Sequence, residues 1–225
     1  AEGPKQIKRF YDEVSVKPEG NMWRVFLDGK VVKSPKGTHL DLPARGLAQR
    51  VAHEWQSQGE HLKPQEMPLT TVGCTALDIV QLDKQACIDR MMPYLRMDTL
   101  CFQDEQRALA ERQEQEWGPA RAWFEERYNV KLNVATSLGA PGHPEETISS
   151  VAEQMKERDM WELCALEIIT QTAKSFIVAL TLLDKEGVTP EDGVRLANLE
   201  ENFQIERWGL VEGDHDVTQT ELLKW

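Results

Sequence analysis

The sequence predicts an α+β protein: a small β-rich N-terminal domain with one helix (residues 1–62), then a larger all-α helical bundle (residues 63–225). Short apolar segments separated by turn residues fill the first 42 positions, which is typical of an antiparallel sheet. Beyond them, apolar residues recur every three or four positions in successive segments, which is typical of helices. Hydrophobic residues make up 40% of the 225, so the chain can bury a substantial core.

The N-terminal segment predicts a sheet because strand and turn signals alternate along it. Residues 22–27 (MWRVFL) have high β-propensity, and the Asp28-Gly29 pair that follows is a strong hairpin signal. Further turns are expected over residues 18–21 (PEGN) and 34–37 (SPKG). The strands expected between these turns are residues 14–16, 22–27, 31–32 and 38–42.

Helices are expected over most of the remaining chain. The first begins at Pro43, which suits a first helical position, and stops at Gln58-Gly59. Thr189 and Pro190 predict the N-cap and first turn of a last long helix. Residues 160–185 are apolar on most sides, which predicts a helix at the centre of the bundle. Other helices are expected over residues 69–80, 84–95, 105–117, 119–128 and 145–156, while residues 130–137 are ambiguous between strand and loop.

Charge is unevenly distributed along the chain. Residues 1–100 carry 14 basic and 13 acidic groups (net +1), whereas residues 101–225 carry 12 basic and 25 acidic groups (net −13). A field of this sign repels nucleic acid and anionic lipid, and it favours a partner with a basic surface. A simpler interpretation also stays open, since excess charge by itself keeps a protein soluble.

The cysteines and apolar segments indicate a reducing compartment and no membrane insertion. The longest apolar segment, residues 163–183, is interrupted by polar side chains and does not resemble a membrane span. Residues 1–10 contain no apolar stretch typical of a secretory signal. Reduced core thiols are expected at the four cysteines, Cys74, Cys87, Cys101 and Cys164.

The functional interpretation depends on the segment LEENFQIERWG (residues 199–209), within the last expected helix. Glu200 and Glu201 are adjacent, so their side chains diverge by about 100° on a helix and cannot both enter one cleft. Glu206 also falls off that face, and this spacing does not supply the facing carboxyl pair of a glycosidase. The sequence therefore predicts no catalytic residue.

An apolar stripe on the same helix has two interpretations. It packs against the protein's own core, or it occupies a groove on a partner, where Phe and Trp anchors dominate the binding energy. The residues close to this stripe are Leu196, Leu199, Phe203 and Trp208, with Glu200 and Gln204 beside them.

A polar stripe crosses the apolar segment 160–185. Glu167, Gln171 and Lys174 fall at i, i+4 and i+7 of the expected helix. Burying an unpaired charge is costly, so these side chains form a polar network inside the bundle or face a cleft. The pattern does not decide between the two.

Metal and nucleotide sites are not predicted. Asp214, His215 and Asp216 are consecutive, and three consecutive residues cannot all ligate one ion without a strained loop. All five histidines are expected to be solvated. No GxxxxGKS/T, GxGxxG or GxSxG motif occurs, so the chain is not expected to hydrolyse ATP itself.

Eight segments carry a resemblance to a known family. They are KRFYDEVSV (8–16), FLDGKVVKSP (26–35), LDLP (40–43), HEWQSQGE (53–60), MPLTTVGCTALD (67–78), DTLCF (98–102), QEWGPARAW (115–123) and LEENFQIERWG (199–209). Together they resemble the ATP synthase assembly factor 2 family, chaperones that bind the free alpha subunit of the enzyme's catalytic head. The resemblance covers nearly the whole chain in the right order.

The resemblance implies a β-rich N-terminal domain, a helical C-terminal domain, no enzymatic activity and no cofactor. It implies a protein of the mitochondrial matrix that holds the alpha subunit until the beta subunit replaces it. A monomer without a small-molecule substrate is expected when the protein is free. Trp55 and Trp117 lie in matching motifs but are expected in the core.

The family's acidic motif before Trp-Gly falls on the last expected helix. The partner contacts expected there are Glu201 first and Glu200 second, then Gln204, Phe203 and Trp208. Two alternatives to the chaperone stay open: a hydrolase that uses acidic residues of the helical domain, and a constitutive subunit of a larger complex.

Overall fold

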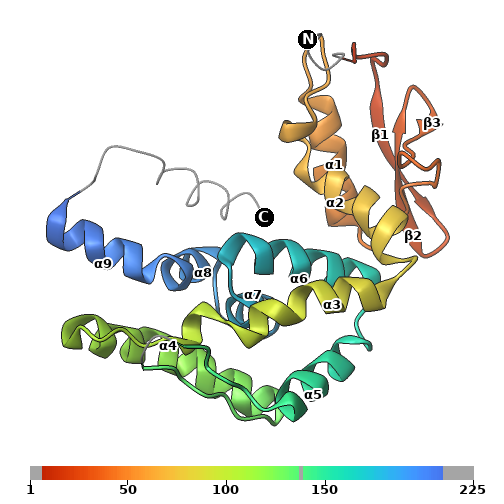
Figure 1. The fold of residues 1–225 in the computed structure, drawn as a ribbon. Helices are drawn as coiled ribbons and strands as arrows, with labels where there is room; N and C mark the ends of the chain where they lie inside the picture. The colour runs from red at the N-terminus through yellow and green to blue at the C-terminus, as the bar shows by residue number, and fades with distance from the viewer. Residues whose placement is uncertain (1–6, 137–138, 210–225) are drawn as a thin grey trace, which may run out of the picture. The chain divides into compact units, whose positions relative to one another are not determined.

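The chain folds into two compact units, residues 1–83 and residues 84–225 (Figure 1). The structure is a computed structural model, and it describes residues 7–136 and 139–209. The first unit contains a sheet and the second is helical over its described residues, so the predicted α+β class is confirmed. Residues 1–83 carry 11 basic and 11 acidic groups, whereas residues 84–225 carry 15 and 27 (net −12). The second unit therefore holds the whole net charge.

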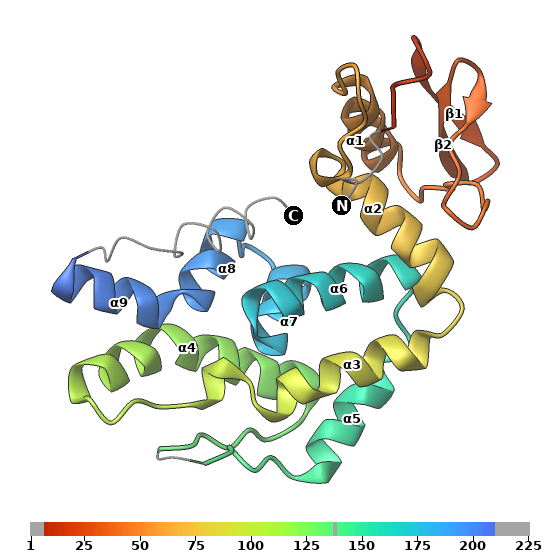
Figure 2. The ribbon, with the colours of Figure 1, turned by 45° about the horizontal axis from the view of Figure 1, so that its top comes forward.

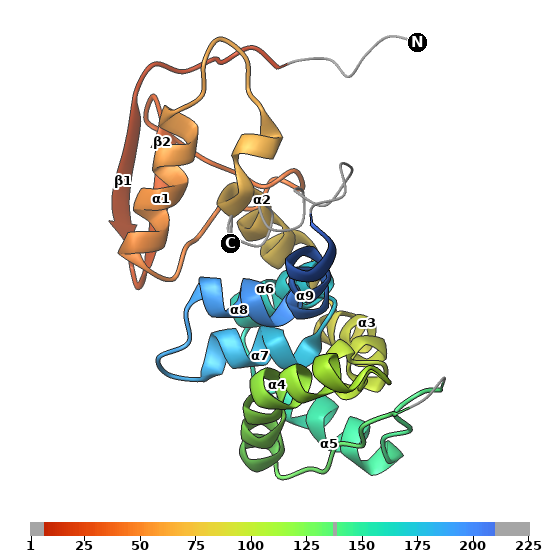
Figure 3. The same cartoon turned by 90° about the vertical axis from the view of Figure 1, so that its left-hand side faces the viewer.

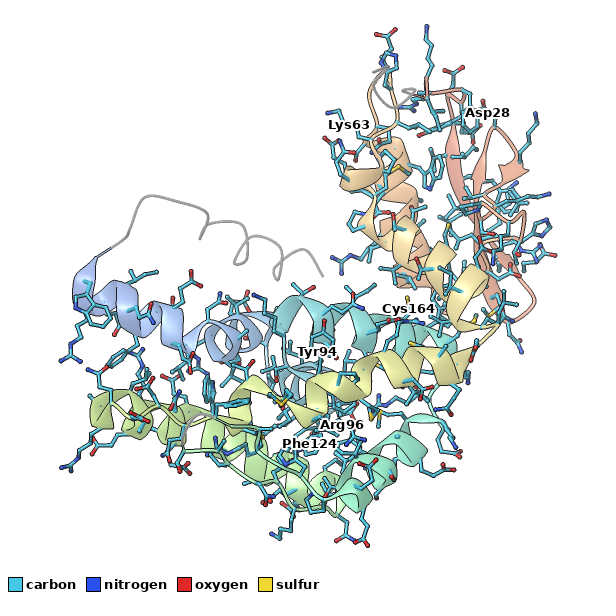
Figure 4. All side chains as sticks on the ribbon, in the orientation of Figure 1. Asp28, Lys63, Tyr94, Arg96, Phe124 and Cys164 are labelled. Atoms are coloured by element: carbon cyan, nitrogen blue, oxygen red, sulfur yellow. The ribbon has the colours of Figure 1, made fainter. Side chains whose placement is uncertain are left out.

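The sheet has three antiparallel strands in the order β1 (Val14–Glu19), β2 (Met22–Leu27) and β3 (Lys30–Val31). Asp28 and Gly29 form the expected tight turn, and both have positive φ (46° and 77°), consistent with a type I′ turn. The carboxylate of Asp28, labelled in Figure 4, accepts hydrogen bonds from the backbone N–H groups of Asp12 and Glu13 at 3.1 and 2.8 Å. The turn residue thus also holds the segment that leads into β1.

Helix α1 (Arg45–Gln56) packs along β1 and β2 (Figure 3). The strand expected over residues 38–42 does not form. Lys33 pairs with His39, and Trp23 pairs with Leu42, each as an isolated bridge. This segment changes its pairing partner within a few residues, so no continuous ladder of hydrogen bonds develops.

The first unit extends to Asp83, beyond the boundary between residues 62 and 63 that the sequence predicts. Its last part is α2 (Pro68–Thr75) followed by a π-helical turn (Ala76–Val80). The Glu54 carboxylate accepts the backbone N–H groups at the start of α2, including that of Thr70 at 2.8 Å. The Ser34 hydroxyl donates to the Asp78 carboxylate at 2.6 Å. Its helical periodicity favours the all-α domain, but these buried bonds tie the segment to α1 and to the segment after β3 in the first unit.

The second unit contains α3 (Lys84–Arg96), α4 (Arg107–Tyr128), α5 (Glu145–Met155), α6 (Met160–Ala173), α7 (Phe176–Asp184), α8 (Pro190–Ala197) and α9 (Leu199–Trp208). Helix α7 is central because it packs against α3, α4, α6 and α8. Figure 2 shows it between α4 and α6. Each residue from Phe176 to Leu180 is 0% exposed. The central position expected for residues 160–185 thus applies to their second half.

Two segments expected to be single helices are each broken in two. Lys174 adopts a left-handed conformation (φ 53°) after α6, and the Ser175 hydroxyl caps α7 by accepting the N–H of Val178 at 3.0 Å. Asn198, at φ −106° and ψ 19°, separates α8 from α9. The Asn198 side chain makes no capping bond to α9, and its amide nitrogen has no hydrogen-bond partner among the described residues.

Two further segments differ from expectation around α4. Residues 105–117 and 119–128 were expected as separate helices, yet α4 runs through Pro119. Pro119 and Gln115 are both exposed, so water can bond the carbonyl that the proline leaves without a partner. Residues 130–136 form no strand, although Ala135 makes one parallel bridge with Phe102.

Of the polar stripe, only Glu167 is buried in a network inside the second unit. Glu167 is 8% exposed, and its carboxylate accepts two hydrogen bonds from Arg90 (2.5 and 2.9 Å) and one from the Cys87 thiol (3.2 Å). Burial alone would raise the pKa of Glu167, but the bonds from Arg90 and Cys87 lower it. Gln171 donates to the same carboxylate at 3.3 Å, whereas Lys174 lies beyond the helix and is exposed.

Candidate partner-binding surface

The start of α9 is fixed on α4, and the two helices lie side by side (Figures 1 and 2). Trp117 of α4 is 0% exposed, and its indole N–H donates to the main-chain oxygen of Leu196 at 2.9 Å. Leu196 and Leu199 are 7% and 2% exposed. Trp117 is therefore a core residue, as expected, and the first half of the predicted apolar stripe packs inside the protein.

Glu200 joins the same contact through a hydrogen bond. The side-chain amide of Gln113 donates to Glu200 Oε1 at 2.7 Å, and Gln113 is only 1% exposed. Burial raises the pKa of Glu200, which the bond from Gln113 partly opposes. Glu200 is half-buried and serves first as a tie between the two helices.

An ion pair continues the contact along α9. The guanidinium of Arg112 donates to both oxygens of the Glu206 carboxylate at 2.5 and 3.1 Å, and to Glu116 at 3.2 Å. The bond from Arg112 lowers the pKa of Glu206. Glu206 is an exposed residue, so this pair contributes more to the orientation of α9 than to stability.

The far end of α9 is exposed. Trp208 is 68% exposed, an unusual exposure for the largest side chain. The guanidinium of Arg207 lies 5.8 and 5.9 Å from the ring centres of Phe203 and Trp208, within range of cation–π attraction. Gln204 is exposed, and Glu201 and Phe203 are half-buried. This end combines aromatic, acidic and amide groups on a helix whose other end is fixed.

The structure divides the candidate residues into two groups. Glu200 and Glu201 both lie in the first turn of α9, where Glu200 faces Gln113, while Phe203, Gln204 and Trp208 follow later in the helix. The apolar stripe is core at its start and exposed at its end, so the core interpretation holds for the first half, and contact with a partner stays a prediction for the second. Arg112 and Gln113 are the residues that sequence reasoning missed. Their partners lie 94 and 87 residues away, a distance at which no local pattern signals the pairing.

The described residues contain no group of three or more His, Cys, Asp or Glu side chains that could hold a metal ion. Asp214, His215 and Asp216 lie outside the described residues. His143 differs from the solvated histidines expected: it is half-buried, its Nδ1 accepts the N–H of Asn133 at 3.1 Å, and burial lowers its pKa.

Among the residues that the structure describes, no helix is both long and apolar enough to cross a membrane.

Comparisons with known proteins agree with this fold. Residues 8–125 match the family model described as ATP12 chaperone protein. Protein atp12, mitochondrial, of Schizosaccharomyces pombe is 27% identical over 229 residues, covering 96% of this chain and 78% of that protein. Protein ATP12, mitochondrial, of Saccharomyces cerevisiae is 25% identical over 263 residues, covering 97% and 81%. The crystal structure of Atp12 from Paracoccus denitrificans superposes with a TM-score of 0.87 at 25% identity, covering 97% of this chain and 93% of that one.

Proposed function

Because this chain belongs to the ATP12 chaperone family, we propose that it binds the unassembled alpha subunit of the F-type ATP synthase until the beta subunit replaces it. The family match over residues 8–125 carries the proposal and supports a chaperone of ATP synthase assembly. The matching family is described as a chaperone and not as an enzyme, so the hydrolase alternative is set aside. The geometry of α9 also speaks against free catalytic carboxylates there, since Gln113 bonds Glu200 and Arg112 bonds Glu206.

The surface of α9 suits a chaperone that covers its client and is displaced from it during assembly. An unassembled subunit exposes apolar interface that is prone to association. Trp208 offers a large exposed anchor for such a surface, with the Arg207 guanidinium beside its ring and the acidic Glu201 and Glu206 on the same helix. The net charge of −12 on residues 84–225 speeds the encounter with a basic partner more than it tightens the complex.

The proposed partner contacts are Glu201 in the first turn of α9, and Phe203, Gln204 and Trp208 later in the helix. Glu200 contributes by holding α9 on α4 through Gln113 and by adding negative charge at the edge of this surface. We also propose that the protein works in the mitochondrial matrix as a monomer. Both yeast relatives are named mitochondrial, which is consistent with that compartment.

The test is capture of newly made alpha subunit by the purified full chain, measured by co-purification and by titration. Trp208→Ser and Glu201→Lys are expected to weaken capture about tenfold each, because anchors of this kind dominate interface energy. The matched controls are Leu183→Ser, an apolar residue of α7 that is 40% exposed, and Glu191→Lys, an exposed acid of α8. Both controls are expected to capture as wild type does.

The outcomes separate function from site. Failure of the wild-type chain to hold alpha subunit would contradict the chaperone assignment itself. Normal capture by folded Trp208→Ser and Glu201→Lys chains would leave that assignment in place and move the contact surface away from α9. Circular dichroism and thermal unfolding establish that each variant is folded.

A further inference from the structure

An apolar groove lies on the β-rich unit, within residues 7–83. It has a volume of about 600 Å³ and is formed by α1, α2, the π-helical turn and the loops beside them. Apolar or weakly polar side chains make up most of its walls. Among them are Ile7, Trp55, Leu62, Met67, Cys74 and Ile79. Most of its lining surface is therefore available for burial against an apolar ligand group.

The π-helical turn presents Ile79 to this groove. Gln81 N–H bonds the carbonyl of Ala76, five residues back, at 2.8 Å. This widened turn buries Asp78 (6% exposed) and leaves Ile79 52% exposed. Ile7 on the groove wall is 58% exposed. Large aliphatic side chains this exposed on both sides of one concavity are typical of a contact surface.

Trp55 contributes an aromatic side chain to the groove. Its main-chain oxygen accepts the Tyr11 hydroxyl at 2.6 Å, but its buried indole Nε1 has no hydrogen-bond partner among the described residues. The side chain lines the groove and also an adjoining cavity of about 590 Å³ that includes Phe10, which is 67% exposed. Because this nitrogen is itself buried, the part of the Trp55 side chain that is exposed consists of carbon atoms.

The charges that line the groove are mainly positive. Its carboxylate, Asp78, is already bonded by the Ser34 hydroxyl (2.6 Å) and the Lys36 backbone N–H (3.0 Å). The Lys36 ammonium donates to the main-chain oxygen of Asp78 at 2.7 Å. Lys33 is exposed and lines both cavities. The groove therefore offers a cation beside an apolar floor, opposite in sign to residues 84–225.

We propose that this groove binds an extended segment of the client polypeptide, in which an apolar side chain is flanked by a carboxylate. The apolar side chain packs between Ile79 and Trp55, and the carboxylate approaches the exposed Lys33. The inference rests on the proposed function, because it takes the alpha subunit as the client. It gives the β-rich unit a contact of its own.

Binding is measured with the full chain and overlapping 15-residue peptides that span the alpha subunit. Peptides with an apolar residue beside Asp or Glu are expected to bind, and to slow alkylation of the groove thiol of Cys74. Ile79→Ser and Lys33→Glu are each expected to weaken this binding about tenfold. Leu82→Ser (71% exposed) and Arg50→Glu (exposed) lie outside the groove lining and are expected to change nothing.

A photo-crosslinking residue at position 79, with position 50 as its control, tests the same contact in the complex with whole alpha subunit. Crosslinks from position 79 to the alpha subunit support the proposal. Crosslinks only to a second copy, or to residues 210–225 of the same chain, overturn the client assignment. Unchanged capture and peptide binding by both groove variants also overturn it, while leaving the chaperone function intact. Absence of capture by the wild-type chain would instead count against the proposed function.

Discussion

Gln113 and Glu200 meet between α4 and α9, where the amide of one donates to the carboxylate of the other at 2.7 Å. Gln113 also accepts the backbone N–H of Asp104 at 2.8 Å, so one buried side chain satisfies two polar groups. Replacing Gln113 by Ala leaves the Glu200 carboxylate and the Asp104 N–H without that partner. The contact that fixes the candidate surface therefore depends on a residue that is itself hidden from any partner.

Gln113→Ala is expected to lower the free energy of unfolding by about 1–3 kcal/mol, the usual cost of leaving buried polar groups unpaired. Urea unfolding followed by circular dichroism measures this change. Gln115→Ala, at an exposed position of the same helix, is the control and is expected within about 0.5 kcal/mol of wild type. Equal stability of the two variants would mean that the Gln113 bonds do not stabilise the α4–α9 contact.

Asp98 connects the 3₁₀ turn Thr99–Cys101 to the start of α7. It is 0% exposed, and its carboxylate accepts the Leu100 N–H (3.0 Å), the Ser175 hydroxyl (2.7 Å) and the Ile177 N–H (3.0 Å). Asp98→Asn replaces one acceptor oxygen with a donor that faces these groups. The variant is expected to lose about 2–3 kcal/mol of stability at pH 7, measured by urea unfolding.

The same residue predicts a pH dependence. Burial raises the pKa of Asp98 to about 6, against the opposing hydrogen bonds, whereas its ordinary value is 3.8. Between about pH 6 and pH 4 the folded protein thus holds a proton that the unfolded chain has released, so this group stabilises more as the pH falls. The stability difference between wild type and Asp98→Asn is expected to grow by about 1–3 kcal/mol from pH 7 to pH 4.5. A difference that shrinks on acidification would show that the Asp98 pKa is depressed instead.

Arg90 and Arg96 on α3 offer a matched comparison of ion pairs. The side chain of Arg90 is 45% exposed and pairs with Glu167, whose side chain is 10% exposed. Arg96, labelled in Figure 4, is 44% exposed and pairs with Glu145, whose side chain is 68% exposed. The two arginines are equally exposed, so burial of the carboxylate distinguishes the pairs.

Arg90→Ala is expected to lose about 1–3 kcal/mol at pH 7, because it leaves a buried carboxylate without its main partner. Arg96→Ala is expected to lose less than about 1 kcal/mol, as exposed pairs do. The Glu167 pKa is lowered in the folded protein, so the stabilisation is present above its ordinary value of 4.5 and is lost as the pH falls through the folded value. Urea unfolding at pH 7 and below pH 4 measures both effects. Equal losses for the two variants at pH 7 would argue against a special role for the buried carboxylate.

Local signals in the sequence predicted much of the fold. The Asp28-Gly29 turn and the start of α8 at Thr189 and Pro190 are confirmed, because each is set by the conformational preference of one or two residues. Thr189 and Asp192 also form a reciprocal capping box. Helix type and approximate position followed from apolar spacing in the same way.

The interruptions and the site contacts could not be predicted, because distant residues determine them. The Asp98 carboxylate reaches across 77 residues to Ser175, a partner that the helical pattern of residues 160–185 does not indicate. Glu54 and Ser34 likewise draw the α2 segment into the first unit. On the candidate surface, the sequence indicated α9 but gave no sign that Gln113 would bond Glu200. A local pattern shows which face of a helix is polar but does not identify the partner of that face.

The four cysteines provide a test of how well the cores are closed. Cys87, Cys101 and Cys164 are at most 1% exposed, and burial raises the pKa of each thiol, to about 12 for Cys87 and about 11 for Cys164. The thiolate is the reactive form, so these three are expected to react only when the helical unit opens. Cys74 is half-buried in the groove of the first unit, and burial raises its pKa as well.

With an aromatic disulfide reagent at pH 8, the native protein is therefore expected to release one thiol equivalent slowly, and the remaining three on addition of denaturant. Peptide mass mapping identifies the modified residue, and Cys74→Ser is expected to abolish the native phase. Rapid modification of Cys87, Cys101 or Cys164 in the native protein would mean that the bundle opens far more readily than its packing around α7 indicates.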